Sequence, residues 1–493
     1  MPAPSPLAPS KPRHVHIDGR TLEGGGQLVR IAIGLSALTG RPVSIDHVRG
    51  NRQGGKGLKR SHAAAVKLLA EISGSEVTGS EVGSQHLDFI PQSSTTKSGP
   101  LLDLSKVSVK PEYDINLTTA GAVFLVFQAL YPYLLHVGSR APGSFVKVNI
   151  TGGTNSSHSP SYDYVSQVIV PNFARLGLPP LSVILHKRGW SSGPIDLGAV
   201  TFLIHALGPR GRSDNGEERT QPWKKRQRQT AEPVSTFPRM NLMDHKRGKV
   251  TQVDITVLAP DLATPNANPK YGDGYTVRQF IEEGTQRSLR RALQKMDPAI
   301  FKHSASSPPE EDPHTKRANQ DAPVPIRIHT SEATQHRSHV YILIVAHTSW
   351  GFRIAHDVLG SVGGNRSARR RDKGKQKQHP AQADSQNADI LSGAAELVNR
   401  CVTGFIEEIS DANANDNSDE KPASNVKRSC VDQYMRDQIV VFEALGEACR
   451  SDRHAAEEEV TDAGIMEDER AWTLHTKTAQ WVCRQILDAW YLR

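Results

Sequence analysis

The stretch Leu22-Glu23-Gly24-Gly25-Gly26-Gln27-Leu28-Val29-Arg30 places three consecutive glycines between a β-rich run and an apolar helical run. Glycine adopts backbone conformations that other residues avoid, so this stretch predicts a tight turn from a strand into a helix. The first N–H groups of a helix lack partners within it and can bind an anion. We therefore predict a phosphate site at residues 22–30. A glycine-rich turn without a ligand is the competing interpretation, because such turns are common.

On both sides of this turn, short β-rich runs alternate with amphipathic helical runs, the pattern of an α/β or α+β protein. Two blocks share the order β-α-β-α-β and lie roughly 100 residues apart, which suggests an internal repeat. The first block is predicted to contain strands 14–18, 42–48 and 86–90 and helices 26–38 and 59–72. The second is predicted to contain strands 114–117, 145–150, 181–185 and 200–206 and helices 122–135 and 162–176.

The composition changes after Gly208, where a polar stretch that includes the basic run 224–228 predicts a linker. Further elements are predicted as strands 250–257 and 340–346 and helices 277–294 and 389–409, separated by low-complexity segments 304–322, 366–386 and 411–427. Near the end we predict a helix at 431–445, a strand at 471–474 and a helix at 478–490. We interpret the low-complexity segments as surface insertions into a smaller α/β domain. Residues 1–13, rich in Pro and Ser, are interpreted as a disordered tail.

The length of 493 residues predicts two or three folding units. The formal charge of +8 and a pI of about 9.2 favour phosphate-rich partners without proving them. Four cysteines without a C-x-x-C pair support neither a zinc site nor a disulfide framework, so a reducing compartment fits best. The longest apolar run, 120–135, is broken by Gln128 and Pro132 and is too short for a bilayer, so no membrane association is expected.

A second glycine-bearing segment, Arg49-Gly50-Asn51-Arg52-Gln53-Gly54-Gly55-Lys56-Gly57, nearly matches a Walker A loop. Gly57 stands where a Ser or Thr hydroxyl should hold Mg²⁺, which argues against the alternative of a P-loop NTPase. The cations of this region suit phosphate oxygens instead, namely Arg49, Arg52, Lys56, Lys59 and Arg60. A solvated charged turn is the competing interpretation.

A third candidate is His475, in the stretch Trp472 to Ala479, at the end of the predicted strand and before the last predicted helix. A neutral imidazole there could attack a phosphorus atom whose oxygens face the helix N-terminus. The chain contains 20 histidines, so local context alone favours an ordinary surface histidine.

Several separated motifs, taken in order, resemble the RNA 3′-terminal phosphate cyclase family. They are Glu23-Gly24-Gly25-Gly26-Gln27 with Arg30, the basic stretch 49–62, Thr119-Ala120-Gly121 with Gln128, Gly152-Gly153-Thr154, and Tyr434-x-x-Asp437-Gln438 before His475. The resemblance implies a large domain of repeated β-α-β-α-β-β units, formed by residues 14–207 and 429–493, and a smaller inserted α/β domain at residues 208–428. It also implies that His475 takes AMP from ATP and passes it to an RNA 3′-phosphate. The neighbouring 2′-hydroxyl then displaces AMP and leaves a 2′,3′-cyclic phosphate.

The same resemblance implies the site residues. Those expected to bind the nucleotide are Glu23, Gln128, Pro160, Tyr434, Asp437 and Gln438, and those expected to bind phosphate or RNA are Gln27, Arg30, Arg52 and Arg60. A divalent metal, expected to be Mg²⁺, would offset charge on the ATP phosphates, with Glu23 as its candidate ligand. One departure is Ser61, which stands where the family often has Gln.

The expected partner is RNA with a 3′-phosphate end. The basic runs 224–228 and 369–377 favour a nuclear location, with the cytoplasm as the alternative. A non-catalytic branch of the same superfamily, active in ribosomal RNA processing, lacks the nucleotide-accepting histidine, so His475 argues against it. A basic RNA-binding scaffold without catalysis is a further alternative.

Overall fold

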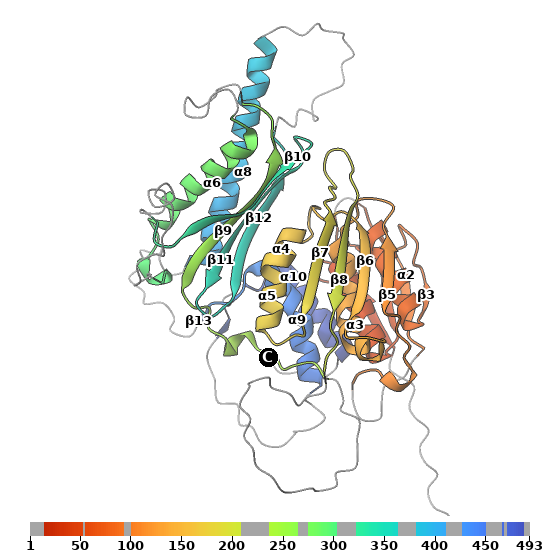
Figure 1. Ribbon diagram of the computed structural model, residues 1–493. Coiled ribbons are helices and arrows are strands. Elements are labelled where there is room, and N and C mark those ends of the chain that lie inside the picture. The colour runs from red at the N-terminus through yellow and green to blue at the C-terminus, as the bar shows by residue number, and fades with distance from the viewer. Residues whose placement is uncertain are drawn as a thin grey trace, which may run out of the picture.

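The computed structural model describes residues 14–52, 55–92, 100–208, 236–264, 275–302, 322–362, 381–410, 426–449, 466–467 and 471–487. Figure 1 shows two large bodies of mixed helix and sheet that lie side by side. The predicted tail, both basic runs and most of the low-complexity segments lie outside the described residues. Among the described helices, none combines the length and apolarity that crossing a membrane requires.

The first unit consists of a four-stranded sheet and two helices. Its elements are β1 (Val15–Asp18), α1 (Gly26–Thr39), β2 (Val43–Asp46), α2 (Arg60–Ser73), β3 (Glu76–Thr78) and β4 (Leu87–Ile90). The sheet order is β1-β2-β4-β3, with β1 and β2 parallel and β4 antiparallel to both of its neighbours. The predicted strands and helices of this unit are present, and only the short, largely exposed β3 was not predicted.

The second unit repeats this topology. Its elements are β5 (Glu112–Asn116), α3 (Val123–Val137), β6 (Val146–Gly152), a helical segment over 162–175, β7 (Leu181–Lys187) and β8 (Gly198–Ile204). The sheet order β5-β6-β8-β7 has the same parallel and antiparallel pairs as the first unit. The predicted internal repeat of β-α-β-α-β-β units, and with it the α/β (α+β) fold class, is therefore confirmed.

The helical segment of the second unit is not a regular α-helix throughout. It comprises α4 (Tyr162–Tyr164), a π-helical turn η3 (Val165–Ile169) and α5 (Val170–Arg175). Pro171 lies near the start of α5 and has no N–H to donate, so the π turn just before it adjusts the hydrogen-bond ladder. Short 3₁₀ turns elsewhere are η1 (Leu104–Lys106), η2 (Gly138–Arg140), η4 (Leu242–Asp244) and η6 (Pro298–Ile300).

A separate sheet of order β10-β9-β11-β12 lies within the range predicted as an inserted domain. Its strands are β9 (Val250–Pro260), β10 (Ile326–Thr334), β11 (Val340–Thr348) and β12 (Arg353–Gly360), and its helices are α6 (Val277–Leu293) and α8 (Ala381–Ile409). The two helices and this sheet enclose a core of their own. Strands β10 and β12 were not predicted, because both are edge strands with many polar residues. Helix α8 was predicted to begin at residue 389. It begins earlier, at Ala381, inside the segment 366–386 that was interpreted as low complexity.

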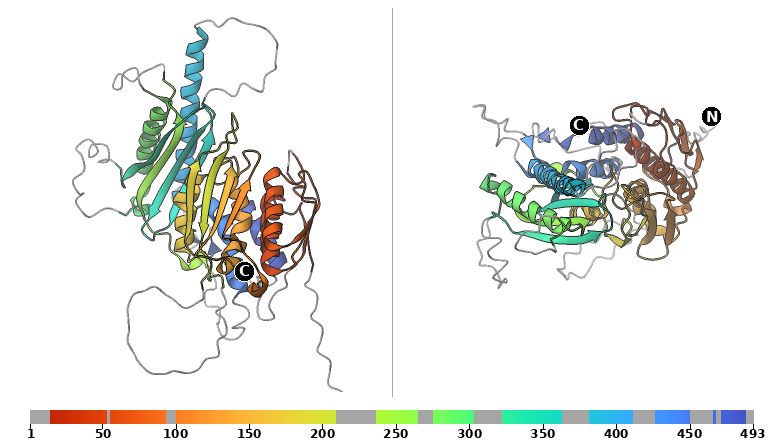
Figure 2. Two further views of the ribbon diagram at one scale, coloured as in Figure 1. Left: turned by 45° about the vertical axis from the view of Figure 1, so that its right-hand side comes forward. Right: turned by 90° about the horizontal axis from the view of Figure 1, so that it is seen from above.

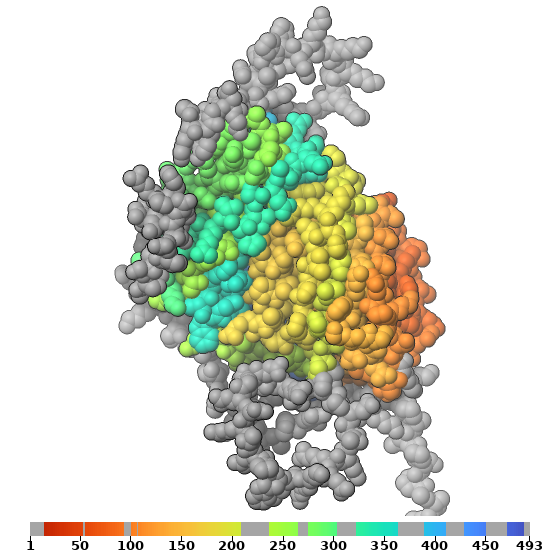
Figure 3. All heavy atoms as spheres, in the orientation of Figure 1, coloured from red at the N-terminus to blue at the C-terminus, as the bar shows by residue number. Residues whose placement is uncertain are grey.

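The opposite face of this sheet packs against the second unit, as Figures 1 and 2 show. Gln167 Nε2 donates to Thr256 Oγ1 at 2.9 Å, and Asn172 Nδ2 donates to the Arg353 carbonyl oxygen at 2.9 Å. In Figure 3 the green and teal surface of the sheet borders directly on the yellow surface of the second unit. The inserted sheet is therefore joined to the helical segment 162–175 by specific polar contacts.

The last described elements are β13 (Val426–Lys427), α9 (Gln433–Ala448), β14 (Met466–Glu467) and α10 (Leu474–Leu487). The predicted strand at 471–474 is wrong. Thr473 starts α10 instead, because its Oγ1 accepts from the Thr476 N–H at 3.3 Å and its carbonyl oxygen accepts from the Lys477 N–H at 2.9 Å. His475 consequently lies in the first helical turn and not at the end of a strand.

One large core joins both repeat units with α9 and α10. Aromatic rings contact one another through it. Phe127 and Phe202 stack with ring centroids 4.1 Å apart, and Phe173 and Phe442 meet edge to face with centroids 5.2 Å apart. Phe237 and Leu242, which precede β9, also pack into this core. The core thus ties together segments that are far apart in sequence, and the candidate site lies along its edge.

Asp357 on β12 faces the seam between the inserted sheet and α9, where Tyr341 Oη donates to its Oδ2 at 2.8 Å. Burial raises the pKa of Asp357 to about 6, the Tyr341 hydrogen bond opposes the rise, and the nearby Asp432 and Asp163 add to it. The folded protein therefore holds this proton more tightly than the unfolded chain, so stability falls as the pH rises through roughly 4 to 6.

We expect Asp357→Asn to stabilise the protein at pH 8 by about 1–3 kcal/mol, because it removes the cost of ionising the carboxyl. Near pH 4 the carboxyl is already protonated, and the gain should vanish. Thermal unfolding of both proteins at the two pH values measures this difference. Glu81→Gln, at an exposed position, is the control. An equal gain at both pH values would contradict the argument.

Candidate active site

The N-termini of α1 and α10 meet although they lie at opposite ends of the sequence. The Glu23 N–H donates to Thr478 Oγ1 at 3.3 Å. His475 Nδ1 lies 2.8 Å from Glu23 Oε2 and 3.2 Å from Gln27 Oε1. Farther along, Arg41 Nη1 donates to the Ile486 carbonyl oxygen at 2.6 Å, so the two helices run in parallel. The parallel packing places His475 beside the glycine-rich turn.

The His475 imidazole is half exposed, with 51% of its side chain accessible. Burial lowers its pKa below the usual 6.5, Asp437 opposes this change, and Arg52 and Arg30 reinforce it. The ring is therefore neutral at pH 7. Because Nδ1 points at the Glu23 carboxylate, Nε2 is the nitrogen that can act as a nucleophile.

The Glu23 carboxylate is buried between two partners, the Arg52 guanidinium and His475. The glycines beside it have no room for a side chain. A Cβ at Gly25 would lie 2.7 Å from Glu23 Oε1, and one at Gly26 would lie 2.1 Å from His62 Nε2. The glycine run therefore permits close approach of buried groups as well as a turn.

His62 is a part of this site that sequence reasoning placed only within a basic stretch. It is buried, and its Nδ1 accepts from the Lys59 N–H at 3.4 Å at the start of α2. Burial lowers its pKa to about 3, and Arg30, Arg49 and Lys59 add to the effect. A buried neutral histidine among cations thus supports the start of α1. One feature of the sequence could have indicated the role of His62, namely its position three residues after Lys59, the residue that caps α2.

Asp437, near the start of α9, connects His475 to the interior of the protein through Gln27. Its Oδ2 accepts from Gln27 Nε2 at 3.2 Å, its Oδ1 accepts from Gln438 Nε2, and Gln438 Oε1 accepts from Gln128 Nε2. Burial raises the pKa of Asp437 to about 6, and its electrostatic interaction with His475 is the largest opposing influence. A continuous polar chain therefore runs from Gln128 to Glu23 and Arg52.

A cavity opens beside this polar chain. Its polar wall is formed by Gln27, Arg30, Gln128, Asp437 and Gln438 together with Pro160, and its apolar wall includes Phe124, Phe127, Tyr131, Phe173 and Phe442. Burial lowers the pKa of Arg30 to about 10, which leaves it charged at pH 7, and Asp437 opposes the change. An aromatic wall with a few convergent polar groups is typical of a site for a flat, polar ring.

Two of the predicted site residues lie outside this arrangement. Tyr434 is exposed on the first turn of α9, with its ring centroid 5.9 Å from that of His356, and it does not line the cavity. Arg60 is exposed at the start of α2. The other predicted residues line the cavity or belong to the polar chain, namely Glu23, Gln27, Arg30, Arg52, Gln128, Pro160, Asp437, Gln438 and His475.

Arg49, the first cation of the loop that resembles Walker A, forms its hydrogen bond within the loop itself. Arg49 is buried, and its Nη1 donates to the Gly55 carbonyl oxygen at 2.7 Å, so it holds the loop and does not face solvent. The expectation that Arg49 neutralises phosphates is not met by this arrangement. α2 begins only at Arg60, with Lys56 exposed in the preceding loop.

The fold and the site together define the class of this protein. It is an α+β protein with repeated β-α-β-α-β-β units, a separate inserted sheet, and a histidine where the N-termini of α1 and α10 meet. A family model described as RNA 3′-terminal phosphate cyclase matches residues 21–491. The chain belongs to that family.

The similar proteins include three named RNA 3′-terminal phosphate cyclase. That of Koribacter versatilis is 37% identical over 270 residues, which cover 55% of this chain and 61% of the relative. That of Ignicoccus hospitalis is 36% identical over 203 residues, which cover 41% of this chain and 52% of the relative. That of Methylococcus capsulatus is 36% identical over 191 residues, or 38% and 48%. The chain thus spans about half the length of the curated relatives it matches.

Proposed function

We propose that this chain converts RNA 3′-phosphate ends to 2′,3′-cyclic phosphates with ATP, through AMP carried on His475. The observation that carries the proposal is the His475 imidazole, which lies 2.8 Å from the buried Glu23 carboxylate and contacts Gln27 at the polar wall of an aromatic-lined cavity. The names of the relatives and the family membership support the reaction class.

In the first step His475 Nε2 attacks the α-phosphorus of ATP. An N–P bond forms, the bond to the bridging oxygen breaks, and pyrophosphate leaves with the bonding electrons. The ring becomes positively charged while Nδ1 keeps its proton, and the Glu23 carboxylate at 2.8 Å offsets that charge. Arg30 and Arg52 supply positive charge for the phosphate oxygens.

In the next step an oxygen of the RNA 3′-phosphate attacks the phosphorus of AMP and the N–P bond breaks, which restores the neutral histidine. The resulting anhydride makes AMP a good leaving group. The 2′-hydroxyl then attacks the terminal phosphorus, loses its proton and displaces AMP. This last step is intramolecular, and a well-oriented group has an effective concentration on the order of 10⁵ M or more.

A divalent cation, which we expect to be Mg²⁺, would reduce the negative charge of the ATP phosphates. Mg²⁺ is usually held by one or two carboxylates together with phosphate oxygens. Glu23 suits this role in kind, but its carboxylate contacts Arg52 and His475, so a metal there would have to replace the Arg52 contact. No cluster of three or more metal-binding side chains occurs among the described residues. The ATP phosphates would therefore supply most ligands.

The test is labelling with ATP that carries the isotope in the α-phosphate. We expect an acid-labile AMP on the protein and, after addition of an RNA with a 3′-phosphate, a 2′,3′-cyclic phosphate end. Label transferred only from the γ-phosphate would favour a kinase. Tight RNA binding without any labelling would favour a non-catalytic scaffold.

A further inference from the structure

The loop over residues 154–163 connects β6 to the helical segment and carries Pro160 at the wall of the cavity. Its backbone is unusual at His158, where φ is 59° in a residue other than glycine. Such a conformation persists only where neighbouring structure holds it. The contacts at the two ends of this loop therefore decide where Pro160 lies.

The residues that follow β7 hold the first end of the loop. The N–H groups of Thr154 and Asn155 donate to the Gly189 carbonyl oxygen at 3.0 and 2.9 Å, and the Gly189 N–H donates to Thr154 Oγ1 at 2.9 Å. A Cβ at Gly189 would lie 2.2 Å from the Gly198 nitrogen, so the chain is packed tightly here. The start of the loop thus has a fixed position relative to Gly189.

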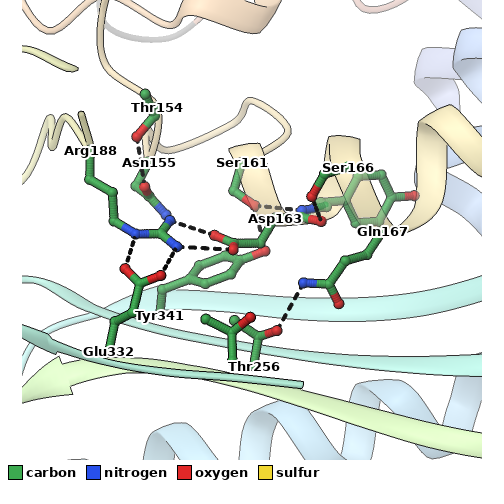
Figure 4. A network of polar contacts seen from close by, with 12 residues as sticks. Thr154, Asn155, Ser161, Asp163, Ser166, Gln167, Arg188, Thr256, Glu332 and Tyr341 are labelled. Carbon is green, nitrogen blue, oxygen red and sulfur yellow. Dashed lines mark hydrogen bonds and ion pairs between the residues drawn. The ribbon is translucent and has the colours of Figure 1, made fainter. Parts of the chain in front are cut away.

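Arg188, the residue before Gly189, holds the other end of the loop (Figure 4). Its Nη1 and Nη2 donate to the two carboxylate oxygens of Asp163 at 2.7 and 3.1 Å. Asp163 is 2% exposed and the Arg188 side chain 13% exposed. Paired charge-assisted hydrogen bonds of this kind are strong and directional. Two consecutive residues after β7 therefore hold both ends of the loop that carries Pro160.

The inserted sheet also contacts Arg188. Arg188 Nε and Nη2 donate to the Glu332 carboxylate on β10 at 2.6 and 2.9 Å. Close by, Ser161 Oγ donates to Tyr341 Oη on β11 at 2.6 Å. The residue directly after Pro160 and the residue that clamps the loop are thus both bonded to the inserted sheet.

We propose that Arg188 is a positioning residue for the nucleotide pocket, which holds the Pro160 wall in place and makes its position depend on the inserted sheet through Glu332. Arg188 does not line the cavity and does not contact the polar chain around His475, so it acts through Pro160 and not on the reacting atoms. The proposal rests on the proposed function, because it takes the cavity as the place where ATP binds.

The test compares variants by the ATP concentration that half-saturates AMP transfer and by the rate at saturation. We expect Arg188→Met to raise the half-saturating concentration on the order of tenfold, with a much smaller change in the saturated rate. Glu332→Gln, a milder change at a side chain that is 47% exposed, should shift it in the same direction by less. Arg188→Lys should recover only part of the loss, because lysine lacks the planar fork.

Arg278→Met is the matched control. Arg278 bonds two carboxylates, Asp261 and Glu282, but this network lies entirely within the inserted unit. Its loss should lower the thermal unfolding midpoint and leave the ATP dependence unchanged. Unchanged ATP dependence in Glu332→Gln and in Arg188→Lys, or an equal shift in Arg278→Met, would overturn the proposal even if Arg188→Met does not fold. If the wild-type protein carries no AMP, the proposed function fails, and equilibrium binding of a fluorescent ATP analogue to the same variants then decides the role of Arg188.

Discussion

His475→Ala is expected to abolish AMP transfer to the protein, with a loss of at least about a thousandfold, because no other group stands in the same position to attack the α-phosphorus. The fold should survive, since half of the imidazole is exposed and its contacts are to the Glu23 and Gln27 side chains. Labelling with α-phosphate-labelled ATP and a thermal unfolding scan measure the two properties separately.

Lys477→Ala is the control for this substitution. Lys477 is exposed on the same helical turn, and its replacement removes a charge close to His475. It should reduce labelling only slightly. Labelling that survives in His475→Ala at the wild-type level would show that the nucleophile lies elsewhere. Loss of labelling in both variants would indicate that AMP transfer is sensitive to any substitution at the start of α10, and the loss in His475→Ala could not then be assigned to the imidazole.

Gly26→Ala is expected to reduce AMP transfer by about a hundredfold or more, although it adds a single methyl group. The new Cβ would lie 2.1 Å from His62 Nε2 and 3.1 Å from Arg30 Nη1. Because His62 is buried, the start of α1 would have to move, and Glu23 and Gln27 would move with it. We also expect a loss of about 1–3 kcal/mol in stability, as is usual for overpacking.

A helical glycine elsewhere provides the comparison. A Cβ at Gly284 in α6 would make ordinary contacts with Val398 at 3.8 and 3.9 Å, so Gly284→Ala should keep full activity and gain up to about 1 kcal/mol from helix propensity. Adding His62→Ala to Gly26→Ala should relieve the clash and recover part of the lost stability. If Gly26→Ala is as active as the wild-type protein, the tight packing around His62 is not required for AMP transfer.

Much of the architecture could be predicted from the pattern of the chain. The repeated units were predictable because their strands are short apolar runs and their helices have clear amphipathic periods. Strands β10 and β12 were not predictable, since edge strands tolerate polar residues such as those of Arg327 to Thr334. The strand predicted at 471–474 was wrong because the side chain of Thr473 caps α10, and a cap depends on hydrogen bonds that local apolarity does not show.

The candidate site, like the fold, could be predicted only in part. The sequence by itself determined the glycine-rich turn, the repeat and, through several motifs in one order, the residue types that the site contains. Only the tertiary structure decided which of them meet: Glu23 with His475, Asp437 with Gln27, and His62 beneath Gly26, while Tyr434 and Arg60 stay outside the cavity. The physical reason is that local turns and helices follow from neighbouring residues, whereas contacts between residues hundreds of positions apart exist only once the core has packed α1, α9 and α10 together.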